Sequence, residues 1–300
     1  EICACLVGSE MCIRDRILTS AWRNDVVNSD DYRAYVGGTS GLIYGYVNDG
    51  FYTVADFEPF DSKSRSWKLK EGVVDSSPLS DTPRPGNAKF KKLTPVDPNS
   101  TNPYQLTEAD RTVIGNTTPK FSGGFGLNAT YKGFDMSMFF NFMYDFDVLN
   151  ANKIMLTTWA DNKENNFLMN IASDKRWRNF DDMGNEIRYS PEVLAEFNKN
   201  ATMWNPTSIG RPICMSYAVE DGSFLRLNSA TLGYTLPSVW TKKVGLSKVR
   251  FYVSGNNLFT LTGYSGYDPE VNIATGLTPN IDYNRYPRSR TYTFGAQLTF

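Results

Sequence analysis

Oxygen-bearing side chains recur at alternate positions in one stretch of the sequence, at Asp97, Asn99 and Thr101, with Asp110 further on. Calcium-binding loops of the EF type space their ligands in this way, around a glycine that makes a sharp turn. This stretch departs from the pattern, because Asn102 stands where the glycine would be and Thr101 replaces an acid. The spacing to Asp110 is also too long by about two residues. We therefore expect a solvated turn and assign no metal site, keeping Asp97, Asn99 and Asp110 only as calcium-loop candidates.

Asp268 and Glu270 form a second pair of carboxylates, on a segment that contains Pro269. Glycosidases use two acids that face each other across a bound sugar, and this segment has no defined opposite wall. Structural use is therefore favoured over catalysis. The sequence contains no histidine, which excludes Ser-His-Asp catalysis, Cys-His catalysis and histidine metal ligands in this chain. We predict neither enzyme activity nor a cofactor.

Three tryptophans lie in the long stretch Asp145–Gly222, at Trp159, Trp177 and Trp204. Aromatic faces bind the apolar faces of sugar rings, and loops commonly carry binding residues. The alternative is that these side chains hold the loop together or meet a partner protein, because large aromatic residues anchor interfaces as readily as ligands. The three are therefore candidates for ligand or partner contact. In the same stretch, Ser190 followed by Pro191 predicts the start of one helix.

Amphipathic strands are the elements that must position these side chains. Apolar and polar residues alternate in several segments, a period of two that is typical of strands with two different faces. The segments are Phe121–Tyr131, Phe134–Tyr144, Ser223–Leu236, Lys248–Thr262 and Arg290–Phe300. Leu42–Val54 is predicted as a further strand because it is rich in Tyr, Val and Phe. Lys132 and Gly133 predict a tight hairpin turn between Phe121–Tyr131 and Phe134–Tyr144. In Ser223–Leu236, Leu225 and Leu227 are out of phase with Leu232, which predicts a bulge or a change of environment.

The last strand has one face suited to hydrocarbon and one suited to water. Its apolar side chains share a face and are Tyr292, Phe294, Ala296, Leu298 and Phe300. Threonines and Gln297 fall on the opposite face. An amphipathic strand of this kind occurs in membrane barrels and in soluble sandwiches, so the strand alone does not decide between them.

The lengths of the connections between strands favour a membrane barrel. Shorter and longer connections alternate strictly along the chain. The shorter ones are Asn24–Gly41, Lys132–Gly133 and Pro237–Ser247, and the longer ones are Asp56–Lys120, Asp145–Gly222 and Gly263–Ser289. Transmembrane barrels have short turns on the periplasmic side and long loops outside, whereas a sandwich has no reason to sort loops by end. A secreted, soluble β-sandwich that binds glycans is the alternative.

The composition supports these classes and excludes others. Basic residues number 31 and acidic residues 32, a balance that gives no reason to expect a nucleic-acid partner. No run of about 18 apolar residues is present, so no transmembrane helix is predicted. Aromatic residues make up 14% of the chain.

The first sixteen residues are expected not to be protein. Val7–Arg16 (VGSEMCIRDR) resembles the translation of a sequencing-library adapter read in frame. We therefore treat residues 1–16 as an artefact and residues 17–300 as the protein, a fragment whose N-terminus lies upstream. Removing Cys3, Cys5 and Cys12 leaves only Cys214, so no disulfide or cysteine-metal framework is expected.

Several segments resemble the C-terminal barrel region of SusC/RagA-type TonB-dependent outer-membrane transporters. They are Tyr44–Gly50 (YGYVNDG), Asp110–Asn116 (DRTVIGN), Ser223–Asn228 (SFLRLN), Leu232–Pro237 (LGYTLP), Asn256–Leu261 (NNLFTL) and Tyr264–Asn272 (YSGYDPEVN). Their order and spacing also fit the family from about residue 17 to the end. The Asp97 stretch occupies a place where the family often has a calcium-loop-like pattern.

The resemblance implies an all-β fold: a partial, open, antiparallel transmembrane β-barrel of about six to seven strands with long extracellular loops. It also implies outer-membrane import of glycan or peptide nutrients in a Gram-negative bacterium.

The implied partners are outer-membrane lipid, a SusD-like surface lipoprotein, the TonB complex acting through an N-terminal plug region, and the barrel-assembly machinery. That machinery would recognise the terminal aromatic strand through Tyr292, Phe294, Leu298 and Phe300. This strand should pair on one side only. Arg226 and Arg250 are expected to contact the plug or to form salt bridges at the rim.

Overall fold

The computed structural model describes residues 18–21, 30–35, 37–80, 82–157, 175–209, 212–270, 278–283 and 286–300. Regular structure in these residues is mostly strand, with a few short helices, so the fold is all-β as predicted. The predicted adapter segment and Trp159 lie outside the described residues. Among the described residues, no helix has the length and apolar character needed to cross a membrane.

The strands are β1 (Leu18–Ser20), β2 (Tyr32–Ala34), β3 (Leu42–Gly45), β4 (Asn48–Phe51), β5 (Ala88–Phe90), β6 (Thr112–Asn116), β7 (Phe121–Tyr131), β8 (Phe134–Tyr144), β9 (Asp147–Asn150), β10 (Val219–Asp221), β11 (Phe224–Thr235), β12 (Lys248–Thr262), β13 (Ile281–Asp282) and β14 (Thr291–Thr299). The α-helices are α2 (Ala151–Met155), α3 (Pro191–Phe197) and α4 (Ser238–Thr241). Short 3-10 turns are η1 (Val54–Asp56), η2 (Glu108–Asp110), η4 (Pro206–Ser208), η5 (Ser216–Ala218) and η6 (Lys242–Val244).

The chain forms two compact units. The first comprises Glu1–Thr117, Leu149–Val219 and Ile273–Tyr283, and the second Thr118–Val148, Glu220–Asn272 and Asn284–Phe300. The chain therefore passes from one unit to the other several times. Two connections between strands of the second unit contain segments that belong to the first unit. They are residues 145–223 and 263–290, the two longest connections of the second unit.

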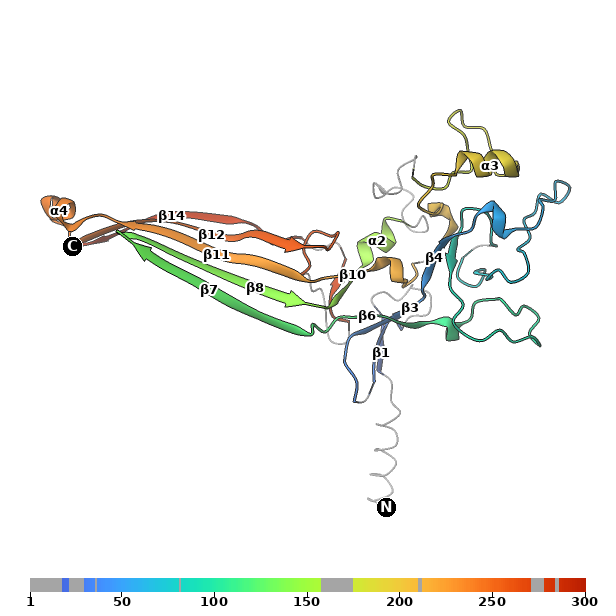
Figure 1. Cartoon of the computed structure of the whole chain (residues 1–300), viewed down its shortest axis with the longest axis horizontal. Coiled ribbons are helices and arrows are strands. Elements are labelled where there is room, and N and C mark those ends of the chain that lie inside the picture. Colours follow the sequence, from blue (N-terminus) through green and yellow to red (C-terminus); the bar gives the residue numbers. More distant parts are fainter. Residues whose placement is uncertain are drawn as a thin grey trace, which may run out of the picture. The chain divides into compact units, whose positions relative to one another are not determined.

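The second unit is a sheet of five long antiparallel strands in the order β14-β12-β11-β8-β7. The hairpin turn at Lys132 and Gly133 has positive φ at both residues, 47° and 89°, which matches the twist of the strands it joins. Figure 1 shows this turn, α4 and the C-terminus at the same end of the sheet. Among the described strands, β14 pairs only with β12, which confirms the prediction that this strand pairs on one side only.

The predicted irregularity in β11 is a β-bulge. Its register shifts between Leu227 and Ser229 against both neighbouring strands. Leu227 pairs with Phe140, whereas Ala230 pairs with Met138. Since Phe140 and Met138 are two residues apart and share a face, Leu227 and Ala230 also share a face although they are three residues apart. The bulge therefore keeps the apolar side chains of both halves of β11 on one side of the sheet.

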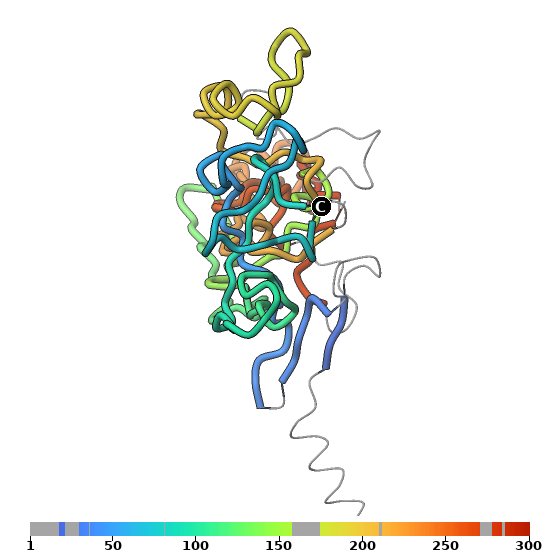
Figure 2. The backbone as a smooth tube through the Cα atoms, turned by 90° about the vertical axis from the view of Figure 1, so that its right-hand side faces the viewer, coloured from blue at the N-terminus to red at the C-terminus, as the bar shows by residue number. Residues whose placement is uncertain are grey.

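The first unit contains shorter strands. One sheet has the order β1-β2-β3-β6, and Figure 2 shows β1 and β2 as neighbouring blue segments. β4 pairs with β5, and β13 pairs in parallel with β9 through Ile281 and Leu149. The expectation of one barrel sheet of six or seven strands is therefore not met among the described residues. Five strands form the long sheet, and the short N-terminal strands form another.

Two predicted segments differ in detail from the structure. Leu42–Val54 is two short strands rather than one, and Asp56–Lys120, which was predicted as a long connection between strands, contains β5 and β6. β6 pairs with β3, about seventy positions earlier, through partners such as Gly115 and Ile43. The predicted helix is α3, with Pro191 in its first turn.

Buried side chains hold the first unit together in three clusters. The largest includes Tyr46, Phe90, Met203, Trp204 and Met215. A second surrounds Ile43, Leu149 and Cys214, and a third joins Trp177, Ile187 and Leu194. In the second unit, the described buried cluster is small and joins Phe146, Val148, Phe224 and Tyr264. The long sheet is therefore left with exposed faces.

Candidate functional site

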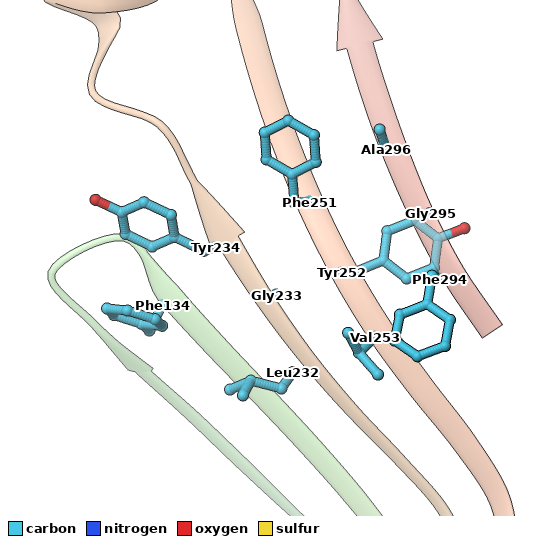
Figure 3. Close-up of a pocket in the computed structure, with 10 residues that line it drawn as sticks. All are labelled: Phe134, Leu232, Gly233, Tyr234, Phe251, Tyr252, Val253, Phe294, Gly295 and Ala296. Carbon is cyan, nitrogen blue, oxygen red and sulfur yellow. The ribbon is translucent and has the colours of Figure 1, made fainter. Parts of the chain in front are cut away.

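One face of the long sheet is apolar and exposed. The cross-strand registers align rows of side chains on it, and one row runs Ala129, Met136, Leu232, Val253, Phe294. Leu232 is 53% exposed and Phe294 is 77% exposed. Leu232, Phe251 and Phe294 help to line an open depression of about 560 Å³. Figure 3 shows these side chains, which come from three strands of the sheet. An exposed apolar face of this extent marks a contact surface for lipid or another protein.

The opposite face of the sheet is polar and carries an ion pair that spans three strands. Arg250 of β12 donates from Nε to Oδ1 of Asp135 on β8 at 2.9 Å, and a second bond joins its Nη2 to Oδ2. Gly233 of β11 lies between them, paired with Asp135 on one side and Tyr252 on the other. A Cβ on Gly233 would lie 2.4 Å from Nη2 of Arg250. The glycine therefore leaves room for the two side chains to meet over the strand.

A tyrosine covers a second glycine in the same row. Tyr252 pairs with Gly295 of β14, and a Cβ on Gly295 would lie 2.4 Å from Cζ of the tyrosine ring. Figure 3 shows Tyr252 turned towards Gly295. Aromatic cover of a strand glycine restores packing that the missing side chain would otherwise supply.

The carboxylates of the segment after β12 are structural. Arg226 of β11, whose side chain is 2% exposed, forms an ion pair with Asp268. Its Nε also lies 3.6 Å from Glu270, which in turn pairs with Arg288 at 3.0 Å. The carboxylates are thus held by guanidinium groups and do not face each other across a space for a sugar. Arg226 and Arg250 each form a salt bridge within this chain, and their contact with a plug stays a prediction.

The two acidic calcium-loop candidates accept hydrogen bonds from nearby residues. Asp97 is exposed and accepts a hydrogen bond from the backbone N–H of Asn99 at 2.9 Å. Asp110 is buried, and its oxygens accept bonds from Thr94 and Thr107. Burial alone would raise the pKa of Asp110, but these hydrogen bonds lower it to about 2. Among the described residues, no group of three or more acidic, histidine or cysteine side chains could hold a metal ion.

Of the three candidate tryptophans, the two that the structure describes are core residues. Trp177 is 3% exposed and Trp204 is 2% exposed, so neither offers a ring face to a ligand at the surface. Gly86 packs directly against the ring of Trp177, because a Cβ there would lie 2.1 Å from Cδ1. The indole of Trp204 donates to the carbonyl oxygen of Thr157. These positions match the alternative in which the tryptophans hold a long loop together.

The four residues predicted as the barrel-assembly signal are all exposed. Tyr292, Phe294 and Leu298 lie on the apolar face of β14, and Phe300 follows the strand. Asp135 was not among the predicted site residues, although it is an acid on an otherwise neutral strand face. Its partner could not be identified from sequence, because β8 and β12 are more than a hundred residues apart.

Comparison with known proteins connects this sheet to a family of receptors. A scan against protein-family models gives no match. The TonB-dependent receptor P3 of Formosa agariphila is 33% identical over 270 residues, which cover 88% of this chain and 22% of the relative. SusC of Bacteroides thetaiotaomicron is 38% identical over 88 residues, which cover 28% of this chain and 8% of that receptor.

The chain belongs to the SusC/RagA-type TonB-dependent receptors. It spans about a fifth of the length of the curated relatives it matches first, at 22% and 17%. The solved structure of the RagAB peptide transporter matches with a TM-score of 0.55 and 20% identity, covering 94% of this chain and 25% of the other. The open-open state of the RagAB importer gives a TM-score of 0.54 at 20% identity, with 94% and 25% coverage. These receptors are transport proteins and not enzymes.

Proposed function

We propose that this chain supplies barrel wall and outer loops to an outer-membrane importer of glycan or peptide nutrients, powered through TonB. The observation that carries the proposal is the exposed apolar face of the long sheet in a relative of SusC-type receptors. A strand of 11 residues, the length of β7 and β8, is about 36 Å long at about 3.3 Å per residue. Tilted by about 45°, it crosses about 25 Å, which equals the apolar band of outer-membrane barrels.

The two faces then have different solvents. The apolar face, which carries Leu232 and Phe294, contacts lipid, and the polar face, which carries Asp135, Arg250 and Tyr252, lines the interior. The end with the short connections faces the periplasm, and the long connections supply the outer loops. The terminal residues Tyr292, Phe294, Leu298 and Phe300 serve as the signal for barrel assembly.

The proposed partners follow from the relatives. RagAB is named as a peptide importer. The similarity to SusC and RagAB supports a surface lipoprotein of the SusD type as partner of the protein that contains this chain. Coupling to TonB belongs to regions outside this chain. Candidates for ligand or partner contact in the outer loops include Trp159. Glycan and peptide cargo remain equal alternatives within this proposal.

Two neighbouring residues on opposite faces of β11 give a matched test. Leu232→Arg puts a charge on the apolar face, which costs about 2–4 kcal/mol at the middle of a bilayer, whereas Thr231→Arg puts it on the polar face. We expect Leu232→Arg to deplete the folded protein from the outer membrane and Thr231→Arg to leave it there. Heat-modifiable migration in outer-membrane fractions measures both. Recovery of the unsubstituted protein as a water-soluble monomer would refute the proposal and favour a soluble β-sandwich.

A further inference from the structure

A polar cleft in the first unit is lined by three arginines. Its volume is about 220 Å³, and Arg65, Arg84 and Arg188 line it. They come from three separate parts of the chain, so the fold rather than a local run of charge brings them together. No acidic residue is found among the described residues that line the cleft. The cleft is therefore electropositive, and its volume has room for several water molecules.

Two of the arginines are available to a ligand. In the part of the chain that the structure describes, Arg65 and Arg84 form no ion pair. Arg188 forms an ion pair with Glu186, in which 2.5 Å separates Nε from Oε1. Arg84 lies between Pro83 and Pro85, whose rings fix φ and make the segment stiff. A guanidinium held on a stiff segment loses little conformational freedom when it binds a planar or tetrahedral anion.

An aromatic wall completes the cleft. Trp67 is half-buried, and its ring lies 4.8 Å from that of Phe60. The guanidinium carbons of Arg65 and Arg188 lie 5.4 Å and 5.9 Å from the ring centroid of Tyr189. The ring of Tyr189 thus helps to hold two cations at one place, through cation–π attraction. Aromatic rings beside charged groups provide both a flat apolar surface and a charge-specific contact.

The rest of the lining distinguishes between classes of ligand. Asn87, Asn179, Thr207 and Ser208 contribute amides and hydroxyls, and Leu194 is the only aliphatic residue besides prolines in the described lining. A pocket for an apolar peptide side chain would be lined mainly by aliphatic and aromatic groups. A sugar instead offers many hydroxyls to polar groups and an apolar ring face to an aromatic wall. The lining therefore favours a sugar.

We propose that this cleft binds an anionic sugar, with the carboxylate or sulfate ester of one sugar ring held by Arg65, Arg84 and Arg188. Guanidinium groups pair with both anions through charge-assisted hydrogen bonds. The sugar ring lies against Trp67 or Tyr189. That the sugar is part of a transported nutrient rests on the proposed function, whereas the binding itself does not.

Calorimetry on the purified intact protein in detergent tests the proposal at low salt. The probes are glucuronate, glucose 6-sulfate, neutral methyl glucoside and N-acetyl-aspartate amide. We expect at least one anionic sugar to bind about ten-fold or more tightly than the neutral sugar. Its affinity should fall as sodium chloride is raised, because salt screens exposed charges. The first two probes separate carboxylate from sulfate recognition.

Variants assign the binding to the cleft. Arg84→Gln and Arg65→Gln each remove an exposed charge, and each should weaken the anionic sugar about ten-fold. Lys63→Gln makes the same change in charge on the same loop, outside the cleft lining, and should have no effect. Arg84→Glu should abolish binding of the anion while leaving the thermal midpoint unchanged.

Several results would overturn the proposal. They are equal binding of neutral and anionic sugars, no binding of either anionic sugar, tighter binding of the aspartate amide, and equal losses in Arg84→Gln and Lys63→Gln. Uptake is measured separately in cells. Binding without uptake would count against the proposed function alone, and uptake of an anionic sugar without binding at the cleft would count against this inference alone.

Discussion

Arg250 reaches across β11 to Asp135 and forms two hydrogen bonds with its carboxylate, one of them 2.9 Å long. The two residues belong to strands that do not pair with each other. Their contact depends on Gly233, over which both side chains pass. The ion pair therefore ties three strands together on the polar face of the sheet, in addition to the backbone ladder.

We predict that this pair is coupled through the glycine. Arg250→Gln and Asp135→Asn should lower the thermal midpoint by similar small amounts, and the double variant should lower it no further. In a Gly233→Ala background the coupling should disappear, because the added methyl occupies the space where the side chains meet. Thermal unfolding in detergent provides the measurement. Additive losses in the double variant of the original background would contradict the prediction.

The long strands could be predicted from sequence because their information is local. A period of two over eleven residues and a Lys132–Gly133 turn define β7 and β8 to the residue. The bulge in β11 was also visible, since Leu225 and Leu227 fall out of phase with the rest of the strand. In each case the pattern of neighbouring residues determines the outcome.

The short strands and the buried tryptophans could not be predicted because their partners are distant in sequence. β6 pairs with β3. It lies near the end of Asp56–Lys120, a stretch that is mostly polar and rich in proline. Trp177 is buried against Gly86, 91 positions earlier. Sequence alone therefore could not distinguish a tryptophan that binds a ligand from one that packs in a core. The arginines of the cleft escaped notice for the same reason.

Gly45 should tolerate no side chain. A Cβ there would lie 2.4 Å from the carbonyl oxygen of Cys214, which also accepts a hydrogen bond from the N–H of Tyr46 at 3.0 Å. Backbone cannot move aside as a flexible side chain can, so Gly45→Ala should destabilise the protein by about 1–3 kcal/mol. Gly126→Ala is the control, because its Cβ would meet atoms no closer than 3.5 Å. Chemical denaturation measures both, and equal stability of the two variants would refute the prediction.

We predict that Gly86→Ala destabilises the protein by more than the cost of placing alanine in this backbone conformation. Its φ is +90°, and a Cβ would strike the buried ring of Trp177. Gly50 has a similar φ of +78° with nothing within 4 Å of a Cβ, so Gly50→Ala isolates the backbone penalty, about 1–2 kcal/mol. We expect Gly86→Ala to cost about 2–4 kcal/mol. A loss no larger than that of Gly50→Ala, measured in the same denaturation series, would contradict packing of Trp177 on Gly86.

Asp110 should make stability fall in acid. Its pKa is lowered from 3.8 to about 2, because hydrogen bonds from Thr94 and Thr107 outweigh the effect of burial. A carboxyl group whose pKa is lowered by folding stabilises the fold at any pH above its pKa in the unfolded chain. The contribution of Asp110 should therefore be complete above about pH 4 and lost as the pH falls towards 2.

A pair of asparagine variants checks the role of Asp110. Asp110→Asn should cost about 1–3 kcal/mol at neutral pH and should flatten the acid limb of the stability curve. Asp97→Asn changes an exposed turn residue and should change stability by less than about 0.5 kcal/mol. Denaturation curves from pH 2 to 7 make the comparison. Similar curves for the two variants would show that Asp110 is not the group responsible.

Cys214 should be inert while the protein is folded. It is fully buried as a free thiol beside Ile43 and Leu149, and burial raises its pKa well above the usual value. Because the thiolate is the reactive species, both the missing charge and the lack of access slow alkylation. We expect iodoacetamide at pH 8 to leave the peptide that contains Cys214 unmodified in the native protein. The same peptide should be modified completely in guanidinium chloride, as followed by mass spectrometry. Rapid labelling of the native protein at pH 8 would mean that the segment around Cys214 opens to solvent far more readily than its packing against Gly45 implies.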